Sequence, residues 1–469
     1  MSPLLKKGLL GLGVVVLGGG AYAYSYVQDL GSIAAGYVSQ TLCTNVLIVG
    51  REQAQVEAQD LARDQRSLTT STIGDNWVET TASIGPIRVT TTSVHRPGLG
   101  CSNVAGLPVE DVRQIQRQGP PVSKSAPVDS FEVGSHPDVN GDQLRVAIDR
   151  AFTETADSVY EKKNTRATLV FYDGQLIAER YADGFNGTTP LRGMSMTKSV
   201  TSALAGILVG QGKLDIHKAA GIAGWSDAED SRAQLTTHHL LKMIGGFDYQ
   251  EAYETNPRST LSMMLMTQPD MASYAAEIPT FTSPGKNWDY QTTHSVLLAK
   301  VVRNTINDDQ AYFRFPQEQL FDRIGMHNSH MQADASGTFT GGAFMFASAR
   351  DWLRFGLLYL NDGVHKGQRI LPEGWVEYTR TASNASLEKR PYGAQFWLNN
   401  PAEKQLFPGL PDDAYAAQGH YGQYVVIVPS MKLVVVRMGM TFDKGAFDKN
   451  SFLNDVVAAM PQSGQNRVN

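Results

Sequence analysis

Residues 193–199 read Gly-Met-Ser-Met-Thr-Lys-Ser, and an apolar run follows from 200 to 209 and stops at Gly210. The apolar side chains of this run recur with the spacing of one helical face: Val200, Leu204, Ile207 and Leu208. This periodicity predicts a buried helix. Ser195 then lies at the helix start, where unpaired backbone N–H groups and the positive end of the helix dipole favour developing negative charge.

Lys198 lies three residues after Ser195, so the two side chains project from the same face of the helix. Burial disfavours the charged form of a lysine and leaves a neutral amine that can accept a proton. A serine beside such an amine is an activated nucleophile. The pair therefore predicts covalent catalysis through Ser195. The alternative is an N-cap serine with a solvated lysine, which the apolar helix downstream disfavours.

The same Ser-x-x-Lys spacing occurs a second time, at Ser386 and Lys389. This pair lies in a polar stretch between Asn384 and Pro391, with no apolar helix after it. We assign it no role. The spacing alone is a weak signal, and the surrounding sequence decides between the two copies.

Ser-Met-Thr-Lys-Ser, followed by an apolar helix and Gly-Lys-Leu-Asp, resembles the serine β-lactamase and penicillin-binding-protein superfamily, whose pattern is S-x-x-K with further Y-x-N and K-T-G elements. The closer likeness is to class C β-lactamase-related hydrolases, which include esterases, D-aminopeptidases and 6-aminohexanoate-dimer hydrolase. It extends from about Leu169 to Met438. Three longer blocks stand in family order, at 239–243, 284–288 and 341–351.

The second family element falls on residues 288–292, Trp-Asp-Tyr-Gln-Thr. The resemblance implies that Tyr290 lies near the serine and lysine and carries a proton to the leaving group. Thr292 stands where the family pattern has asparagine; its hydroxyl can still form a hydrogen bond in the substrate-binding site. The alternative for Tyr290 is an ordinary half-buried tyrosine at a helix start.

The third element, Lys-Thr-Gly, has no match, and residues 420–422 read His-Tyr-Gly in its place, directly before a predicted strand. The resemblance implies that the backbone N–H groups of Ser195 and Gln423 form the oxyanion hole. Gly422 would let substrate approach the backbone, because it has no Cβ. His420 either orients substrate or only packs, and both interpretations stay open.

Strand patterns at both ends of the catalytic region indicate an α+β fold. The runs 168–172 and 175–181 flank Asp173-Gly174, a dipeptide typical of a two-residue type I′ hairpin turn. The β-branched runs 424–428 and 433–438 predict a second hairpin. With helical patterns between them, these runs predict an antiparallel sheet built from both ends, flanked by helices and an adjoining helical region. That is the β-lactamase/transpeptidase-like fold which the resemblance implies.

The first 27 residues are typical of a secretory signal. Residues 8–20 carry no charge, follow Lys6 and Lys7, and precede Ala-Tyr-Ala at 21–23, an A-x-A-type cleavage site. Because the uncharged stretch continues to Val27, an uncleaved membrane anchor through residues 8–27 is the alternative. Either a cleaved signal or an uncleaved anchor predicts an exported protein, periplasmic or otherwise extracytoplasmic. An uncleaved anchor would hold it to the inner membrane.

Three further segments follow the first 27 residues. We expect a small accessory region at 28–117, a Pro- and Ser-rich linker at 118–135 and a serine hydrolase domain at 136–462. The two cysteines of the chain are Cys43 and Cys101. A lone pair usually forms a disulfide in an oxidising compartment, and the alternative is two unrelated buried thiols.

The net charge and the spacing of metal-ligating residues limit the classes of molecule that this chain is expected to bind. The formal net charge is −5, and no Lys/Arg run accompanies exposed aromatic residues, so nucleic acid is not an expected partner. His238 and His239 are adjacent and cannot both face one metal from a regular helix, and no third ligand has suitable spacing. We expect no metal or other cofactor, and a small-molecule ester or amide as substrate.

The sequence thus favours a carboxylesterase- or amidase-type serine hydrolase with an acyl-enzyme on Ser195 and with Lys198 and Tyr290 as proton carriers. A penicillin-recognising D,D-peptidase or β-lactamase shares this chemistry, and the missing Lys-Thr-Gly argues against it. The third possibility is a catalytically silent, anchored binding protein of the same fold. The presence of all three residues argues against that possibility.

Overall fold

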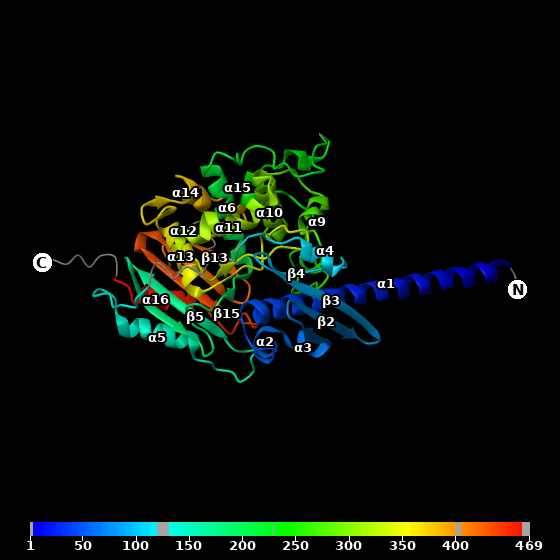
Figure 1. Cartoon of the computed structure of the whole chain (residues 1–469), viewed down its shortest axis with the longest axis horizontal. Coiled ribbons are helices and arrows are strands. Elements are labelled where there is room, and N and C mark those ends of the chain that lie inside the picture. The colour runs from blue at the N-terminus through cyan, green and yellow to red at the C-terminus, as the bar shows by residue number, and fades with distance from the viewer. Residues whose placement is uncertain (1–2, 120–130, 228, 400–404, 462–469) are drawn as a thin grey trace. The chain divides into compact units, whose positions relative to one another are not determined.

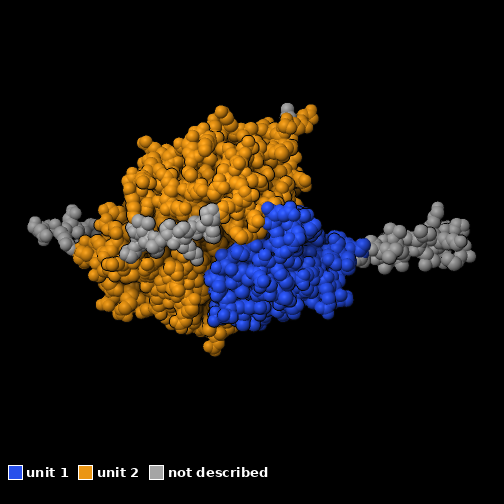
Figure 2. Space-filling model, in the orientation of Figure 1, with its two compact units in different colours: residues 1–95, 101–114, 250–269 blue, residues 96–100, 115–249, 270–469 orange. Residues whose placement is uncertain are grey.

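Two units make up the chain (Figures 1 and 2). The computed structural model describes residues 3–119, 131–227, 229–399 and 405–461. Unit 1 comprises Met1–His95, Cys101–Gln114 and Gln250–Pro269, and unit 2 comprises Arg96–Gly100, Ile115–Tyr249 and Asp270–Asn469. Residues 250–269, which lie inside the predicted hydrolase domain, group with unit 1. Most of the predicted linker, residues 120–130, lies outside the described residues.

Unit 1 contains a long N-terminal helix and a four-stranded antiparallel sheet in the order β1-β2-β3-β4. The helices are α1 (Pro3–Leu42), its π-helical continuation η1 (Cys43–Ile48), α2 (Gln53–Asp60), α3 (Arg63–Leu68), α4 (Val109–Gln114) and α8 (Thr260–Thr267). The strands are β1 (Thr69–Ile73), β2 (Trp77–Ile84), β3 (Ile87–Arg96) and β4 (Gly100–Asn103).

The second half of α1 belongs to the core of unit 1, where Ala35, Val38 and Leu42 are buried. Among the helices that the structure describes, none is long and apolar enough to cross a membrane. Signal cleavage and anchoring through the first 27 residues both remain predictions.

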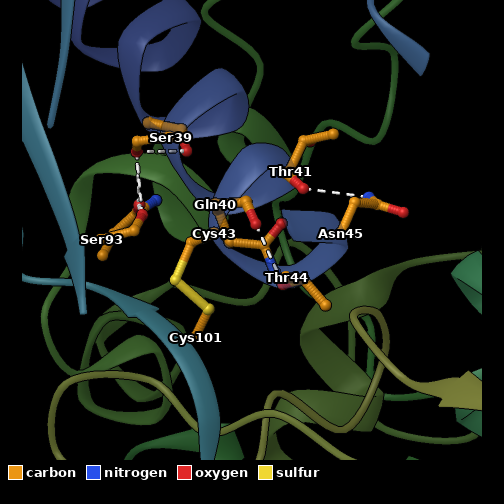
Figure 3. Close-up of a disulfide and its surroundings, with 10 residues drawn as sticks. Ser39, Gln40, Thr41, Cys43, Thr44, Asn45, Ser93 and Cys101 are labelled. Carbon is orange, nitrogen blue, oxygen red and sulfur yellow. Dashed lines mark hydrogen bonds between the residues drawn. A yellow bond between two sulfur atoms is a disulfide. The ribbon is translucent and has the colours of Figure 1, made fainter. Parts of the chain in front are cut away.

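The predicted disulfide between Cys43 and Cys101 is present and joins the start of η1 to β4 (Figure 3). Its Cα atoms are 6.0 Å apart, and both cysteines are buried among apolar side chains. Beside it, the hydroxyls of Ser39 and Ser93 lie 2.8 Å apart, and Ser93 donates to the Asn103 side chain at 2.5 Å. Covalent and polar contacts therefore fix the same elements of unit 1.

Removing this bridge should destabilise unit 1. The cysteines are 58 residues apart, and a cross-link of that span constrains the unfolded chain by about 4 kcal/mol. We expect the variant Cys43→Ala/Cys101→Ala to unfold at a lower urea concentration than the oxidised protein, with circular dichroism as the measurement. Equal midpoints would show that the bridge adds nothing, and two free thiols in protein purified from an oxidising compartment would refute the bridge itself.

The main sheet of unit 2 has six antiparallel strands in the order β12-β13-β14-β15-β5-β6. Its strands are β5 (Thr165–Tyr172), β6 (Gln175–Tyr181), β12 (Trp397–Leu398), β13 (Tyr415–Gly419), β14 (Gln423–Val428) and β15 (Leu433–Gly439). Strand β15 pairs with β5, so the two ends of the hydrolase region meet inside one sheet, as predicted. The β5–β6 turn has φ values of +40° at Asp173 and +90° at Gly174, which confirms the two-residue turn with positive φ.

The helices and small strands of unit 2 surround this sheet. The helices are α5 (Gly141–Phe152), η2 (Met194–Met196), α6 (Thr197–Gly210), η3 (Ser231–Gln234), α7 (Thr237–Lys242), α9 (Met271–Glu277), α10 (Thr292–Ile306), α11 (Asp309–Pro316), η4 (Gln317–Phe321), α12 (Asp322–Ile324), α13 (Ala349–Leu360), α14 (Trp375–Arg380), α15 (Asn384–Leu387), η5 (Pro429–Met431) and α16 (Lys449–Ala458). The small strands are β7 (Leu191–Arg192), β8 (Ser329–His330), β9 (Phe346–Ala347), β10 (Val364–His365) and β11 (Gln368–Arg369).

Helices cover both faces of the sheet (Figure 1). Helices α5 and α16 pack on the face that carries Val426 and Val435. Helix α13 packs on the opposite face, where an added Cβ at Gly356 would come within 2.8 Å of Val425. Alternate residues of a strand point to opposite faces, so a strand covered on both sides is apolar throughout. This explains the continuous β-branched runs of β14 and β15, and the sheet they form supports the site described next.

Candidate active site

Ser195 lies in the single 3₁₀ turn η2, directly before α6. Met194 has a φ of +49°, in the left-handed region that residues with a side chain adopt rarely, so the chain bends sharply into the helix. The Thr197 hydroxyl secures this bend: it donates to Met194 O at 2.7 Å and accepts from Met345 N at 3.2 Å. The structure thus places the serine at the helix start, as the sequence predicts.

Lys198 is buried, with 1% of its surface exposed, and its Nζ lies among three oxygen atoms. These are Ser195 Oγ at 3.1 Å, Thr292 Oγ1 at 2.9 Å and Gly342 O at 3.0 Å. The Thr292 hydroxyl, predicted to form a hydrogen bond in the substrate-binding site, accepts one from the lysine here, and its contact with substrate stays a prediction. The lysine joins η2, α10 and the loop before β9.

Gly341 and Gly342 allow that loop to reach the lysine. Gly341 has a φ of +61°, and an added Cβ there would collide with Ser295 O of α10. A Cβ at Gly342 would lie 2.6 Å from Thr292 Cγ2. The Thr201 hydroxyl of α6 donates to Gly341 O at 2.7 Å. The paired glycines of this block are therefore explained by close backbone approach to both helices.

Tyr290 lies beside Lys198, as predicted: the centre of its ring is 5.0 Å from the lysine Nζ. The ring stacks on Trp397, with centres 5.0 Å apart and planes inclined by 24°, and meets Tyr392 edge-on. Tyr290 is half-buried and lies two residues before the start of α10. Aromatic packing therefore orients the phenol, whereas its role in proton transfer stays a prediction.

Residues 420–422 form the turn between β13 and β14. Tyr421 and Gly422 have φ values of +61° and +82°, both in the left-handed region that residues with a Cβ adopt rarely. An added Cβ at Gly422 would collide with the Arg437 guanidinium. The structure thus gives Gly422 a packing reason in addition to the predicted approach of substrate. The rings of His420 and Tyr421 are 3.9 Å apart, centre to centre.

Arg437, which no sequence pattern identified, supports this turn from inside unit 2. Its guanidinium is fully buried and donates to Gly422 O at 2.7 Å and to Tyr421 O at 3.3 Å. It also donates to the hydroxyls of Thr165 and Thr441, at 2.8 Å each. Burial lowers the pKa of Arg437 to about 10, so the group remains cationic at neutral pH. A single arginine inside an apolar strand was the signal that could have identified it.

The Gln423 side chain supports the turn in the same way. Its amide nitrogen donates to His420 O at 3.1 Å and to Gly439 O at 2.7 Å, while its oxygen accepts from Gly439 N at 3.0 Å. Gly419, just before the turn, lies against the nucleophile segment, since an added Cβ would collide with Gly193 O. The turn therefore borders Ser195. The predicted role of the Gln423 backbone N–H in the oxyanion hole stays a prediction.

The second Ser-x-x-Lys pair has a different environment. Ser386 Oγ donates to Ser383 O at 2.9 Å and to Tyr392 O at 3.1 Å. Lys389 is exposed, and its Nζ donates to Asn287 Oδ1 and to Trp288 O, both at 2.9 Å. This lysine thus binds the loop before Tyr290 and not Ser386. The arrangement agrees with the prediction that the pair has no catalytic role.

The adjacent histidines have separate partners. His238 Nδ1 lies 2.9 Å from the Tyr378 hydroxyl, and His239 Nδ1 accepts from Thr236 N at 3.1 Å. Burial lowers the pKa of His238 to about 4, and it lowers the pKa of His239 as well, so both rings are neutral near pH 7. No group of three or more His, Cys, Asp or Glu side chains within the described residues could hold a metal ion.

Comparison with known proteins agrees with this architecture. Residues 159–458 match the model of the Beta-lactamase family. A 6-aminohexanoate-dimer hydrolase of Paenarthrobacter ureafaciens is 25% identical over 303 residues, which cover 59% of this chain and 73% of that protein.

Two solved structures are similar in fold. One is a Bacillus anthracis protein assigned as a 6-aminohexanoate-dimer hydrolase, with a TM-score of 0.54 and 21% identity, covering 71% of this chain and 86% of that one. The other is a penicillin-binding-protein homologue from Caulobacter crescentus, with a TM-score of 0.53 and 13% identity. The match covers 70% of this chain and 99% of that one. Because the matched family model spans more than half of the sequence and includes Ser195, Lys198 and Tyr290, this chain belongs to the Beta-lactamase family of serine hydrolases.

Proposed function

We propose that this chain hydrolyses small esters or amides through an acyl-enzyme on Ser195. The observation that carries the proposal is the buried Lys198 Nζ, 3.1 Å from Ser195 Oγ. A nucleophile and a base within hydrogen-bond distance of each other are what an activated serine requires.

In this proposal Lys198 acts as a neutral amine, which has two N–H groups and one lone pair. Gly342 O and Thr292 Oγ1 accept the two N–H groups, and the lone pair then faces the Ser195 hydroxyl. Burial disfavours the ammonium form, because a charge loses its hydration there. Lys198 therefore takes the hydroxyl proton as Ser195 Oγ attacks the carbonyl carbon of the substrate.

Tyr290 completes the proton transfers. It gives its phenolic proton to the leaving alcohol or amine as the tetrahedral intermediate collapses to the acyl-enzyme, and the proton that Lys198 took from Ser195 replaces it. Water then attacks the acyl group, and the same side chains move protons in the opposite direction, which frees Ser195. The position of Tyr290 beside the lysine supports this assignment.

The developing oxyanion needs two donors. The backbone N–H of Ser195 at the helix start is the first. The backbone N–H of Gln423, the first residue of β14, is the predicted second. Each donor contributes roughly 3 kcal/mol to transition-state stabilisation.

Esters should be better substrates than β-lactams. The Lys-Thr-Gly lysine of β-lactamases offers a fixed charge to the drug's carboxylate, and residues 420–422 hold a histidine instead. An imidazole is mostly neutral near pH 7 and recognises a carboxylate more weakly than an ammonium group does. We expect kcat/KM at pH 7 to be higher for p-nitrophenyl butyrate and for small amides than for benzylpenicillin, with the ester first because p-nitrophenolate leaves far more readily than an amine.

A 6-aminohexanoate linear dimer belongs in the same panel, since a relative bears that substrate in its name. If benzylpenicillin were the best substrate at pH 7, the esterase and amidase assignment would be replaced by the β-lactamase or D,D-peptidase function.

We propose that the protein acts outside the cytoplasm. A buried disulfide of wide sequence separation is typical of an oxidising compartment such as the periplasm, which supports export of the chain. N-terminal sequencing of protein from the native envelope tests the two forms of this proposal. If the signal is cleaved, the N-terminus of the mature protein should lie just after residue 23. If the segment is an anchor, the intact N-terminus should be found in the membrane fraction.

A further inference from the structure

Gln395 is a buried amide in the loop between α15 and β12, with 2% of its surface exposed. Its φ is +66°, a left-handed conformation that is unfavourable for a residue with a Cβ. Such a conformation persists where surrounding contacts hold it, and it is common near functional sites.

Three helices of unit 2 meet at this residue. Its side-chain oxygen accepts from the Ser295 hydroxyl of α10 at 2.7 Å, and its backbone oxygen accepts from the Ser199 hydroxyl of α6 at 2.7 Å. Its amide nitrogen donates to Leu240 O and Leu241 O of α7, at 3.0 Å each. Both serines are buried, so these hydrogen bonds are shielded from water.

The contacts of Gln395 join the same two helices that Lys198 joins. Ser199 directly follows Lys198 in α6, and Ser295 lies one helical turn after Thr292 in α10. The bond between Lys198 Nζ and Thr292 Oγ1 crosses from α6 to α10 at the active site. Gln395 crosses between these helices a second time, through its own oxygen atoms.

We propose that Gln395 is a positioning residue that fixes α6 against α10 and thereby holds the Lys198 amine between Ser195 and Thr292. It acts through Ser199 and Ser295, not on the reacting atoms. The inference rests on the proposed function, in which Lys198 is the base. An amide suits the position because it donates two hydrogen bonds to α7 while accepting one from α10.

The test compares Gln395→Met with Asn399→Leu. Asn399 is a second buried amide of the same segment, and its side chain bonds only loop atoms of Phe407, Leu410 and Pro411 among the hydrogen bonds of the described residues. Both variants should lower the thermal midpoint. Only Gln395→Met should lower kcat for p-nitrophenyl butyrate, by roughly 10- to 100-fold, because a 1 Å misplacement of a reacting group can cost 100-fold.

The pH profile separates positioning from simple loss of stability. A loosened Lys198 site admits water, which favours the ammonium form, so the acidic limb of kcat/KM should move to higher pH in Gln395→Met and stay in place in Asn399→Leu. The milder variant Ser295→Ala should move it in the same direction. Its combination with Gln395→Met should be little worse than Gln395→Met alone, since both remove the same bond.

Two outcomes would overturn the inference. One is a Gln395→Met protein with the turnover and pH profile of the wild type. The other is an equal loss of turnover in Gln395→Met and Asn399→Leu with unmoved profiles. If Gln395→Met does not fold, Ser295→Ala decides, and an unchanged profile there rejects the proposal. Full activity of Lys198→Ala would instead reject Lys198 as the base in the proposed function, whatever the result for Gln395→Met.

Discussion

Lys198→Ala is expected to lower kcat for p-nitrophenyl butyrate by roughly 100- to 10,000-fold, the range that general acid–base groups contribute. Ser195 Oγ would lose the base that lies 3.1 Å away, and no other lysine is placed there among the hydrogen bonds of the described residues. KM should change little, because the amine is buried and takes part in proton transfer, not in substrate binding. Single-turnover measurements would place the loss in the acylation step.

Lys389→Ala is the matched control. It removes the lysine of the second Ser-x-x-Lys pair, whose amine binds Asn287 and Trp288 at an exposed position. Its kcat should stay within about threefold of the wild-type value, because its amine bonds the loop before Tyr290 and none of the reacting atoms. Retained kcat in a correctly folded Lys198→Ala protein, checked by circular dichroism, would remove the lysine from the mechanism.

Tyr290→Phe is expected to lower kcat for a small amide by a similar factor, roughly 100-fold or more, since the variant lacks the group that protonates the leaving amine. The ring and its stacking on Trp397 are retained, so the loss reports on the hydroxyl. Groups that act as one unit lose activity non-additively, and the double variant with Lys198→Ala should be little worse than the less active single variant.

Tyr392→Phe serves as the control for this prediction, because Tyr392 belongs to the same aromatic cluster and meets Tyr290 edge-on. Its turnover should remain close to that of the wild type. Near wild-type turnover in Tyr290→Phe would leave Lys198 as the sole proton carrier. Fully additive losses would indicate that the two side chains serve separate steps.

Local patterns predicted the fold well. The Asp173-Gly174 turn and the two β-branched runs near the C-terminus depend on backbone preferences of neighbouring residues, and the structure has both hairpins. Ser348 caps α13 by accepting from Asp351 N, a contact between near neighbours in the sequence. The disulfide followed from counting: with two cysteines there is one possible pair.

Long-range contacts explain what the sequence could not predict. Residues 250–269 have no composition that distinguishes them from the hydrolase region, and only tertiary packing assigns them to unit 1. Arg437 and Gln395 act through hydrogen bonds to residues far away in the sequence, so neither lies in a recognisable motif. The family pattern identified Ser195, Lys198 and Tyr290. The residues that hold them in place could be identified only from the three-dimensional structure.

Covalent labelling of Ser195 tests the central claim most directly. A fluorophosphonate probe reacts with an activated serine hydroxyl, so peptide mapping of the labelled, active protein should find one adduct, on Ser195, and none on Ser386. Labelling should be much slower in Lys198→Ala, since the neutral base is gone. Active protein without an adduct on Ser195, or an adduct on Ser386 in its place, would contradict the account.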